Sequence, residues 1–257
     1  MRIITLLTIF LFSFSSAQSS IIIYNRIINF DNDTNNIISD YKALVFEKNH
    51  SFYFNIYDRG DEILKFLKEN NNIIKSTNVV FNNNEYLKIK DNSFSKEILF
   101  YKDLNQNYNW KITSEIKNIL GFKCKKALGE FRGRKFEAWF TSEIPTNYGP
   151  YKFRGLPGTI LSISDTEKMY VFEAIKIIKN IQPNINVESK LSFKFPLGLD
   201  EYLTYKEYID LNNTYLNERR SRILSSLPSG AVVQETSKNH EFDLEKSFEW
   251  EKEPEKP

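Results

Sequence analysis

The chain has 257 residues, of which 41% are hydrophobic and 15% aromatic, and its 35 Lys and Arg nearly balance its 33 Asp and Glu. This composition excludes a disordered chain and a collagen-like repeat, the single cysteine excludes a disulfide scaffold, and a net charge of +2 gives no reason to expect nucleic acid as a partner. Because the chain has only two histidines, His50 and His240, we expect neither a metal nor another cofactor.

The first seventeen residues have the pattern of a secretory signal peptide. Arg2 precedes the apolar run Ile3–Phe14, and the small residues Ser15, Ser16 and Ala17 follow it as a cleavage site. The apolar run would span only about 18 Å as a helix, whereas a bilayer has roughly 30 Å of hydrocarbon. We therefore predict export to the periplasm, the outer membrane or the extracellular space, with no membrane span after cleavage.

From residue 18 to residue 199 the sequence has the pattern of short β-strands separated by turns. Alternating apolar side chains, with turn residues about every ten positions, favour an antiparallel meander over βαβ units. The expected strands are Ile21–Phe30, Tyr41–Glu47, Ser51–Tyr57, Thr77–Phe81, Glu85–Lys90, Lys96–Tyr101, Asn107–Thr113, Gly121–Phe131, Lys135–Thr141, Thr159–Ser164, Met169–Ile178 and Ser189–Phe195. We expect Lys96–Tyr101 to pair with Asn107–Thr113, and a sheet of this length to curl into a half-barrel or an open barrel.

Helical patterns appear in two places. Asp61–Glu69 suits a short helix with Asp61 as its cap. Residues 200–227 suit an amphipathic helical segment that packs on the sheet, because their apolar positions recur at helical spacing. These positions are Tyr202, Tyr205, Ile209, Leu216 and Ile223. Residues 228–257 are charged, and we expect a flexible tail that docks, if at all, through Phe242, Phe248 and Trp250.

A connector rich in proline and glycine joins two of the expected strands between residues 141 and 159. Proline restricts the backbone and glycine permits conformations closed to other residues, so the alternation of the two predicts a loop of one defined shape. Pro157 and Gly158 suit the central positions of a type II turn. We take the aromatic, cationic and turn residues of this loop as a candidate binding site: Tyr148, Tyr151, Phe153, Arg154, Gly155, Leu156, Pro157 and Gly158. The same residues could instead serve only to turn the chain.

Four motifs in this region carry a resemblance to a known family. They are Gly121–Ala127 (GFKCKKA), Phe131–Arg134 (FRGR), Ala138–Pro145 (AWFTSEIP) and Gly149–Gly158 (GPYKFRGLPG). In this order they resemble the GLPGLI family of secreted or periplasmic proteins of Gram-negative bacteria, although Thr159 stands where the family name has Leu. The resemblance implies export and a β-rich fold. It implies no activity and supplies no catalytic residues.

Cys124 is the only cysteine of the chain and therefore cannot form an intramolecular disulfide. Alternation places it with Phe122 on one strand face and places the neighbouring lysines on the other. One interpretation is a small buried hydrophobic residue. The other is a free thiol whose pKa is lowered by Lys123 and Lys125.

Three classes of function remain open at this point. The surplus of aromatic residues, 21 Phe and 14 Tyr, favours a non-enzymatic binding module of unknown oligomeric state for a peptide, a lipid, a small apolar ligand or an outer-membrane partner. A hydrolase is the first alternative, but the nucleophile pattern GxSxG is absent and the carboxylate pairs Asp58/Asp61 and Glu241/Asp243 suit solvated surface charges. An assembly subunit that uses residues 200–224 or the tail is the second alternative.

Overall fold

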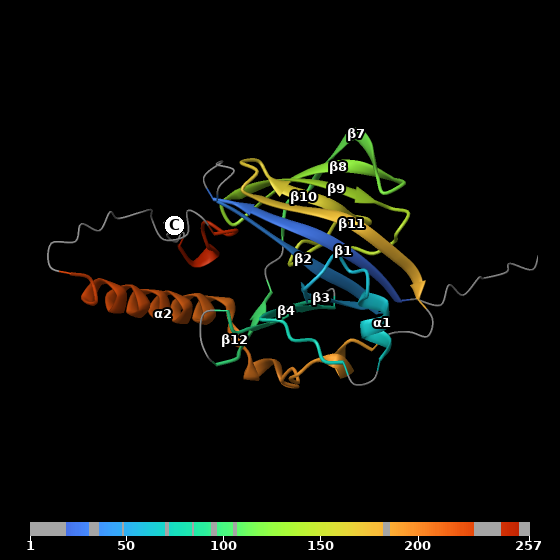
Figure 1. Cartoon of the computed structure of the whole chain (residues 1–257). Coiled ribbons are helices and arrows are strands. Elements are labelled where there is room, and N and C mark those ends of the chain that lie inside the picture. The colour runs from blue at the N-terminus through green and yellow to red at the C-terminus, as the bar shows by residue number, and fades with distance from the viewer. Residues whose placement is uncertain are drawn as a thin grey trace, which may run out of the picture.

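The computed structural model describes residues 19–30, 36–47, 49–69, 72–83, 85–93, 97–104, 107–181, 186–228 and 243–251; the expected signal peptide, His240 and Phe242 lie outside them. Twelve strands of these residues form one sheet, in the order β12-β6-β5-β4-β3-β2-β1-β11-β10-β9-β8-β7 (Figure 1). The strands are β1 Ser19–Asn29, β2 Ile37–Glu47, β3 His50–Ile56, β4 Asn78–Asn82, β5 Leu87–Asp91, β6 Leu99–Asp103, β7 Lys111–Ile119, β8 Phe122–Phe131, β9 Arg134–Thr141, β10 Thr159–Asp165, β11 Tyr170–Ile181 and β12 Leu203–Thr204. The helices are α1 Ile63–Lys68, α2 Tyr205–Ser225 and the 3-10 turns η1 Glu188–Lys190, η2 Leu199–Glu201 and η3 Glu249–Glu251.

The sheet consists of two meanders, β1–β6 and β7–β11, which are joined where β1 pairs with β11. All these pairings are antiparallel, and only the two-residue strand β12 lies parallel to its neighbour β6. The antiparallel meander predicted from the sequence is therefore confirmed. The described strands β7 and β12 end the order at opposite edges without pairing with each other, so the sheet is open.

The central strands are buried on both faces. Ile22 belongs to the hydrophobic cluster on one face, and Ile21 and Ile23 belong to the cluster on the other. The consecutive isoleucines Ile21–Ile23 place apolar side chains on both faces, as expected of a strand that is covered on both sides. The side chains of β7, in contrast, are mostly exposed.

The sheet curls so that its two ends meet over the first of these faces, which we call the concave face. Asp103 at the end of β6 accepts a hydrogen bond of 2.8 Å from Arg132 in the turn between β8 and β9. β6 is next to one edge of the sheet and β8 is next to the other. The result is the half-barrel that the sequence predicts.

The opposite face is covered by α1 and by residues 187–202. Ile63 and Leu67 of α1 lie in its hydrophobic cluster. The expected strand Ser189–Phe195 also lies here, and that expectation is wrong. The rings of Phe193 and Phe195 lie 5.7 and 6.0 Å from the ring of Phe100 in β6. The alternating side chains therefore pack on the face of the sheet, and the segment is not one of its strands.

Two further details differ from expectation. β6 pairs with β5 and β12, and the strand expected at Asn107–Thr113 begins only at Lys111 and pairs with β8. Tyr108 is buried and stacks on Trp110; Tyr108 belongs to the hydrophobic cluster of the concave face, and Trp110 packs against that cluster. These residues therefore pack into the core before the strand begins. Asp61 does not cap α1, because the helix begins at Ile63 and Glu62 is at its N-cap position; the Asp61 carboxylate forms an ion pair of 3.0 Å with Lys176.

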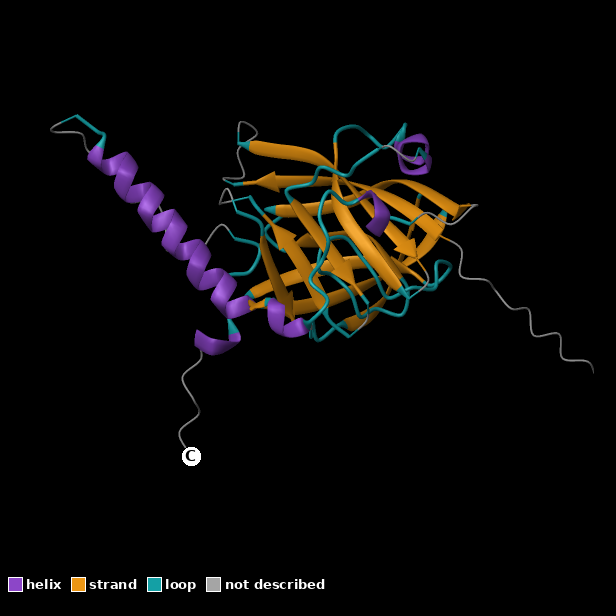
Figure 2. Ribbon diagram, turned by 90° about the horizontal axis from the view of Figure 1, so that it is seen from below, coloured by secondary structure: helices purple, strands orange, loops and turns teal. Residues whose placement is uncertain are grey.

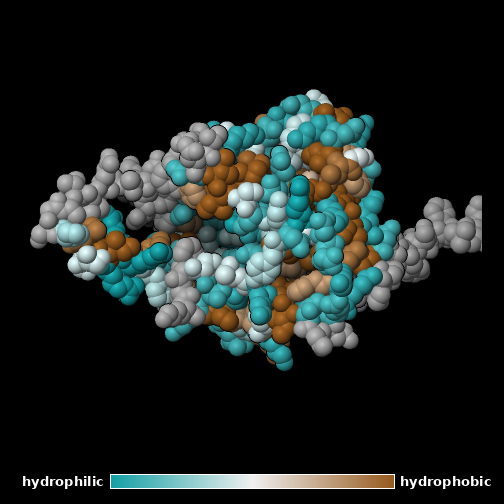
Figure 3. Space-filling view, in the orientation of Figure 1, coloured by the Kyte–Doolittle hydropathy of each residue, from teal (hydrophilic) through white to brown (hydrophobic). Residues whose placement is uncertain are grey.

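Helix α2 begins on the sheet and then leaves it. Thr204 caps its first turn together with Glu207, and Tyr208 and Ile209 are buried against the concave face. Farther along, Leu216 and Ile223 are exposed, so the predicted apolar stripe packs only in its first turns. Figures 1 and 2 both show the helix extending away from the strands, and Figure 3 shows hydrophobic and hydrophilic residues mixed along it. In the described part of the chain, no helix combines the length and the apolar character needed to cross a membrane.

The last described segment, residues 243–251, returns to the concave face. Phe248 is buried, stacks on Trp250 at 4.7 Å and meets the ring of Tyr205 at 5.8 Å. The segment closes the space between α2 and the β8–β9 turn. It therefore forms part of the wall of the pocket described below.

Candidate functional site

The connector between β9 and β10, residues 142–158, is a compact loop. The type II turn expected at Pro157 and Gly158 is not formed, because the backbone N–H of Thr159 that would close it donates to the carbonyl of Ile144 at 3.3 Å. The N–H of Gly158 donates instead to the carbonyl of Leu156 at 2.8 Å, which gives a tighter turn.

Most residues of this loop that the sequence singled out lie in the core. Tyr148, Phe153, Leu156, Gly158 and Arg154 are buried, whereas Gly155 and Pro157 are exposed. The Tyr148 hydroxyl donates to the backbone carbonyl of Asn49 at 2.6 Å. Phe153 lies among aromatic rings, 5.0 Å from Phe136 and 5.7 Å from Phe172. These contacts fasten the loop to the sheet.

Arg154 and Tyr151 differ in where they point. Arg154 donates to the side-chain oxygen of Asn82 at 2.8 Å, its carbonyl accepts from the Trp110 indole at 2.9 Å, and burial lowers the pKa of its guanidinium. Tyr151 is half-buried with a φ of +53°, and its side chain lies in the pocket. Tyr151 is thus the loop residue that the structure brings to the candidate site, and a binding role for the others stays a prediction.

Lys152, between these two residues, belongs to a buried charge cluster that consists of Asp103, Arg132, Lys152 and Glu245. Arg132 lies 2.8 Å from Asp103 and 2.7 Å from Glu245, and Lys152 lies 3.1 and 3.0 Å from the same two carboxylates. All four side chains are at most 8% exposed. The ring of Tyr205 lies 3.8 Å from the Lys152 ammonium, in cation–π contact.

The four buried side chains balance, with two cations for two carboxylates, and the exposed Glu249 adds a third carboxylate at 2.9 Å from Arg132 Nε. Burial alone would raise the pKa of Asp103, but Lys152 and Arg132 outweigh burial and hold that pKa below its ordinary value. The cluster connects β6, the β8–β9 turn, the β9–β10 loop and residues 243–251. It fixes the loop and the last segment on the concave face.

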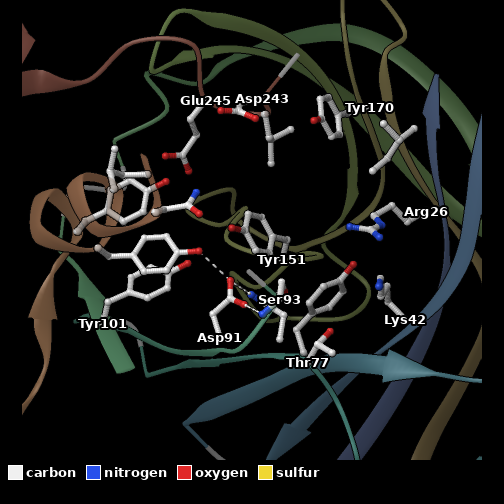
Figure 4. Close-up of a pocket in the computed structure, with 18 of the residues that line it drawn as sticks. Arg26, Lys42, Thr77, Asp91, Ser93, Tyr101, Tyr151, Tyr170, Asp243 and Glu245 are labelled. Atoms are coloured by element: carbon white, nitrogen blue, oxygen red, sulfur yellow. Dashed lines mark hydrogen bonds between the residues drawn. The ribbon is translucent and has the colours of Figure 1, made fainter. Parts of the chain in front are cut away.

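Beside this cluster is a pocket of about 310 Å³, bounded by strands of the concave face, the β9–β10 loop, α2 and residues 243–248 (Figure 4). Six tyrosines line it: Tyr53, Tyr101, Tyr151, Tyr170, Tyr205 and Tyr208. Their rings supply apolar surface and their hydroxyls supply hydrogen-bonding groups. Ligand pockets in proteins have volumes of about 300–1,000 Å³, so the space suits a small molecule.

One end of the pocket carries two cations. Arg26 of β1 binds Asp40 through Nε and Nη2 at 2.9 and 2.6 Å. Lys42 of β2 donates to the same carboxylate at 2.8 Å and to the side-chain oxygen of Asn55 at 2.6 Å. Asp40 does not line the pocket, whereas Arg26, Lys42 and Asn55 do.

Another wall carries Asp91, at the end of β5. Its carboxylate accepts hydrogen bonds from the Tyr208 hydroxyl at 2.8 Å, from the Asn78 side chain at 3.3 Å and from the backbone N–H of Ser93 at 2.6 Å. In Figure 4, Asp91 lies away from Arg26 and Lys42, and Tyr151 lies between them.

Two buried polar atoms of the pocket lining have no hydrogen-bond partner among the described residues. They are the hydroxyl of Tyr53 and the side-chain oxygen Oδ1 of Asn212 in α2. Tyr53 as a whole is only 4% exposed. A buried polar group without a partner costs stability, so these two atoms mark places where a ligand would supply the missing hydrogen bonds.

Cys124 lies outside the pocket lining and is fully buried. Burial raises the pKa of its thiol to about 11. At neutral pH the side chain is therefore a thiol and not a thiolate, which agrees with the interpretation as a buried hydrophobic residue.

Of the other catalytic candidates that the structure describes, Asp243 lines the pocket, whereas His50, Asp58 and Asp61 do not. His50 packs against Phe52 and Phe81, with ring centroids 5.4 Å away in both cases. Asp58 accepts from the backbone N–H of Gly60 at 2.7 Å. Of the second carboxylate pair, Asp243 lines the pocket and Glu241 lies outside the described residues.

Comparison with known proteins gives one family match and similarities of fold. The model of the family Porph_ging, described as a protein of unknown function, matches residues 129–162, which include the FRGR and GLPG motifs. No curated protein matches the chain.

Two crystal forms of PNGF-II, in space groups P21 and C2, resemble the structure with TM-scores of 0.53 and 0.51. Both are 19% identical and cover 77% of this chain. The match covers only 34% and 33% of the PNGF-II chains, so this protein corresponds to about a third of their length. At this identity the similarity concerns the fold alone.

The pocket residues Arg26, Lys42, Tyr53 and Asp91 were not predicted from the sequence. A signal for Arg26 does exist. Alternation places Arg26 on the same strand face as Ile22 and Ile28, and therefore predicts a charged side chain on a face that is otherwise apolar.

Proposed function

We propose that this protein is an exported binding module that holds a small polar molecule in the pocket on its concave face. The observation that carries the proposal is the pair of unpartnered buried atoms, the Tyr53 hydroxyl and Asn212 Oδ1, in a pocket of about 310 Å³. A hydroxyl and an amide oxygen call for a ligand that offers hydrogen-bonding groups of its own.

The composition of the pocket favours a polar ligand over the apolar one considered from the sequence. Arg26, Lys42, Asp91 and the six tyrosine hydroxyls would lose hydration against a hydrocarbon chain without gaining hydrogen bonds in return. The tyrosine rings can still pack against the flat faces of a ligand that has both polar edges and apolar faces.

Binding without catalysis fits the state of the carboxylates. Asp103 and Glu245 each contact two cations, and the pKa of Asp103 is held low, so this carboxylate is poorly suited to donate a proton. Asp91 accepts hydrogen bonds from three neighbours. The proposal therefore assigns these groups to structure and recognition.

Export is supported by the first seventeen residues and by the GLPG motif region. Arg2, the apolar run Ile3–Phe14 and Ala17 have the order of a cleavable signal peptide. Detection of the protein outside the cytoplasm with Gln18 as its first residue would support this part of the proposal. An uncleaved cytoplasmic chain would overturn it.

Binding is tested by ligand-observed NMR with the exported protein. The probes are neutral monosaccharides, sugar acids, amino acids, dipeptides and, as an apolar comparison, a long-chain alcohol. We expect saturation transfer to at least one polar class and a weaker signal from the variants Tyr53→Phe and Asn212→Leu.

Tyr57→Phe is the matched control, because Tyr57 is 89% exposed and does not line this pocket. It should bind like the wild type. Binding of the long-chain alcohol alone, or polar binding that Tyr53→Phe and Asn212→Leu leave unchanged, would overturn the proposed function.

A further inference from the structure

The cationic end of the pocket is built by the register of three strands. Arg26 of β1 lies opposite Asp40 of β2, and Lys42 of β2 lies opposite Asn55 of β3. Directly opposite residues of antiparallel strands share a face, and Tyr53 is two residues before Asn55 on the same strand. Arg26, Lys42 and Tyr53 therefore all project from the concave face at this end.

Among the described residues, the charges at this end do not balance. Arg26 and Lys42 share the single carboxylate of Asp40, so two cations face one anion. The other carboxylates of the pocket lie on other walls: Figure 4 shows Asp91, Asp243 and Glu245 apart from Arg26 and Lys42. Glu245 is also paired with Arg132 and Lys152. Arg26 and Lys42 together therefore keep an excess of one positive charge over Asp40.

Lys42 shows the effect of this excess. Its side chain is 5% exposed, and burial lowers the pKa of the ammonium, with the positive charge of Arg26 lowering it further. A lysine has three N–H donors, of which Asp40 and Asn55 take two. An anion in the pocket would compensate the charge and accept the third.

Tyr53 adds an uncharged donor at the same place. Its hydroxyl has no hydrogen-bond partner among the described residues, and burial raises its pKa well above the ordinary value, so the proton stays on the oxygen. Arg26, Tyr53 and Tyr151 all line this pocket. Cations and a neutral hydroxyl together form a set that suits a carboxylate.

Resting on the proposed function, we infer that the ligand is a small carboxylate, whose anionic group binds to Arg26, Lys42 and the Tyr53 hydroxyl. Asn212 Oδ1 and the Asp91 carboxylate are acceptors in the lining of the same pocket, so the same ligand also carries hydroxyl or amine donors. Two sources share this chemistry: a sugar acid, which offers hydroxyls, and a short peptide with a free carboxyl terminus, which offers an α-amine and amide N–H groups.

The test compares two pairs of probes that differ only in the anionic group, by calorimetry on the exported protein. The pairs are galacturonate with galactose, and glycylglycine with its amide. We expect the carboxylate member of one pair to bind at least tenfold more tightly than its neutral partner, and the pair that responds identifies the source. The preference should weaken with added salt.

Variants separate the anion site from the rest of the pocket. Lys42→Met should remove most of the preference, whereas Asp40→Asn should increase it, because it removes the competing carboxylate. The two substitutions have opposite expected effects, and chemical unfolding of both checks that they fold. A loss of affinity in Asp40→Asn, with an unchanged unfolding midpoint, would contradict the charge assignment.

The outcomes distinguish this inference from the proposed function. Equal binding of the charged and neutral members overturns the carboxylate assignment and leaves the binding module intact. No binding of any polar probe class overturns the proposed function itself, and the inference with it.

Discussion

Replacement of Lys152 by Met tests whether the buried charge cluster holds the molecule together. The substitution keeps the length of the side chain and removes one of the two cations, so Arg132 alone faces Asp103, Glu245 and the exposed Glu249. Lys152 is 1% exposed and lies 3.1 and 3.0 Å from these carboxylates. Removal of one partner from a buried ion pair costs about 3–5 kcal/mol, and domains of this kind are stable by about 5–15 kcal/mol.

We therefore expect Lys152→Met to lower the free energy of unfolding by about 4 kcal/mol, measured by urea denaturation with tryptophan fluorescence. The double variant Lys152→Met/Glu245→Gln leaves one buried cation, Arg132, for one buried carboxylate, Asp103, and should recover at least half of the loss. Lys65→Met is the matched control, because Lys65 is 72% exposed and its partner Glu62 is 70% exposed. It should change stability little.

The same experiment has a defined pH dependence. The pKa of Asp103 is lowered in the folded protein, so its contribution to stability is complete above the pKa of an unfolded aspartate, about 3.9, and is lost as the pH falls through the lower folded value. In Lys152→Met the buried carboxylates outnumber the one remaining buried cation, so protonation of a carboxylate stabilises the folded variant. The difference from the wild type should therefore shrink as the pH falls from 7 to about 4.

A loss below about 1 kcal/mol in Lys152→Met at pH 7 would refute this reasoning, because that is the value of an exposed ion pair. A double variant that is less stable than Lys152→Met would refute it as well.

Two further predictions concern the β9–β10 loop and helix α2. Gly158→Ala should cost about 3 kcal/mol in urea denaturation, because φ is +149° and a Cβ would lie 2.6 Å from the Thr141 carbonyl carbon; Gly121→Ala, with φ of +85° and open space, should cost only about 1 kcal/mol. Equal losses would contradict the steric argument. Ile209→Ala should cost about 2–4 kcal/mol, whereas Ile223→Ala, at an exposed position, should stay within about 0.5 kcal/mol. A large loss at Ile223 would mean that the outer part of α2 is covered.

The strands were largely predictable because their signals are local. Ile21–Phe30, Tyr41–Glu47 and Ser51–Tyr57 differ from β1, β2 and β3 by a few residues at their ends. Apolar alternation and turn residues report directly on a strand that has at least one buried face.

Alternation does not say whether a segment pairs within a sheet or packs on top of it. Phe193 and Phe195 alternate as strand residues do, yet they cover the face of β6. The choice depends on which sheet edges are free, and this is a property of the whole fold. The start of β7 was misplaced for a similar reason, because Tyr108 and Trp110 are apolar residues that fill the core before the strand begins.

The pocket was beyond prediction from local patterns. Its cationic end combines Arg26, Lys42 and Tyr53 from three strands, and the buried charge cluster joins Lys152 to Glu245 across 93 positions of the chain. Only the register between strands and the return of residues 243–251 bring these groups together. The sequence directed attention to the β9–β10 loop, of which Tyr151 reaches the pocket.

An open sheet exposes unpaired backbone groups at its two margins, where a strand of another molecule could add on. Here both margins are poor templates for such addition. At one margin β7 carries Lys111, Glu115 and Lys117, and its register with β8 shifts between Ile112 and Ile116. At the other, β12 offers only two residues before the chain enters α2. Charge, irregular register and shortness are the means by which β proteins avoid edge-to-edge aggregation, so this half-barrel can stay open without seeding fibrils.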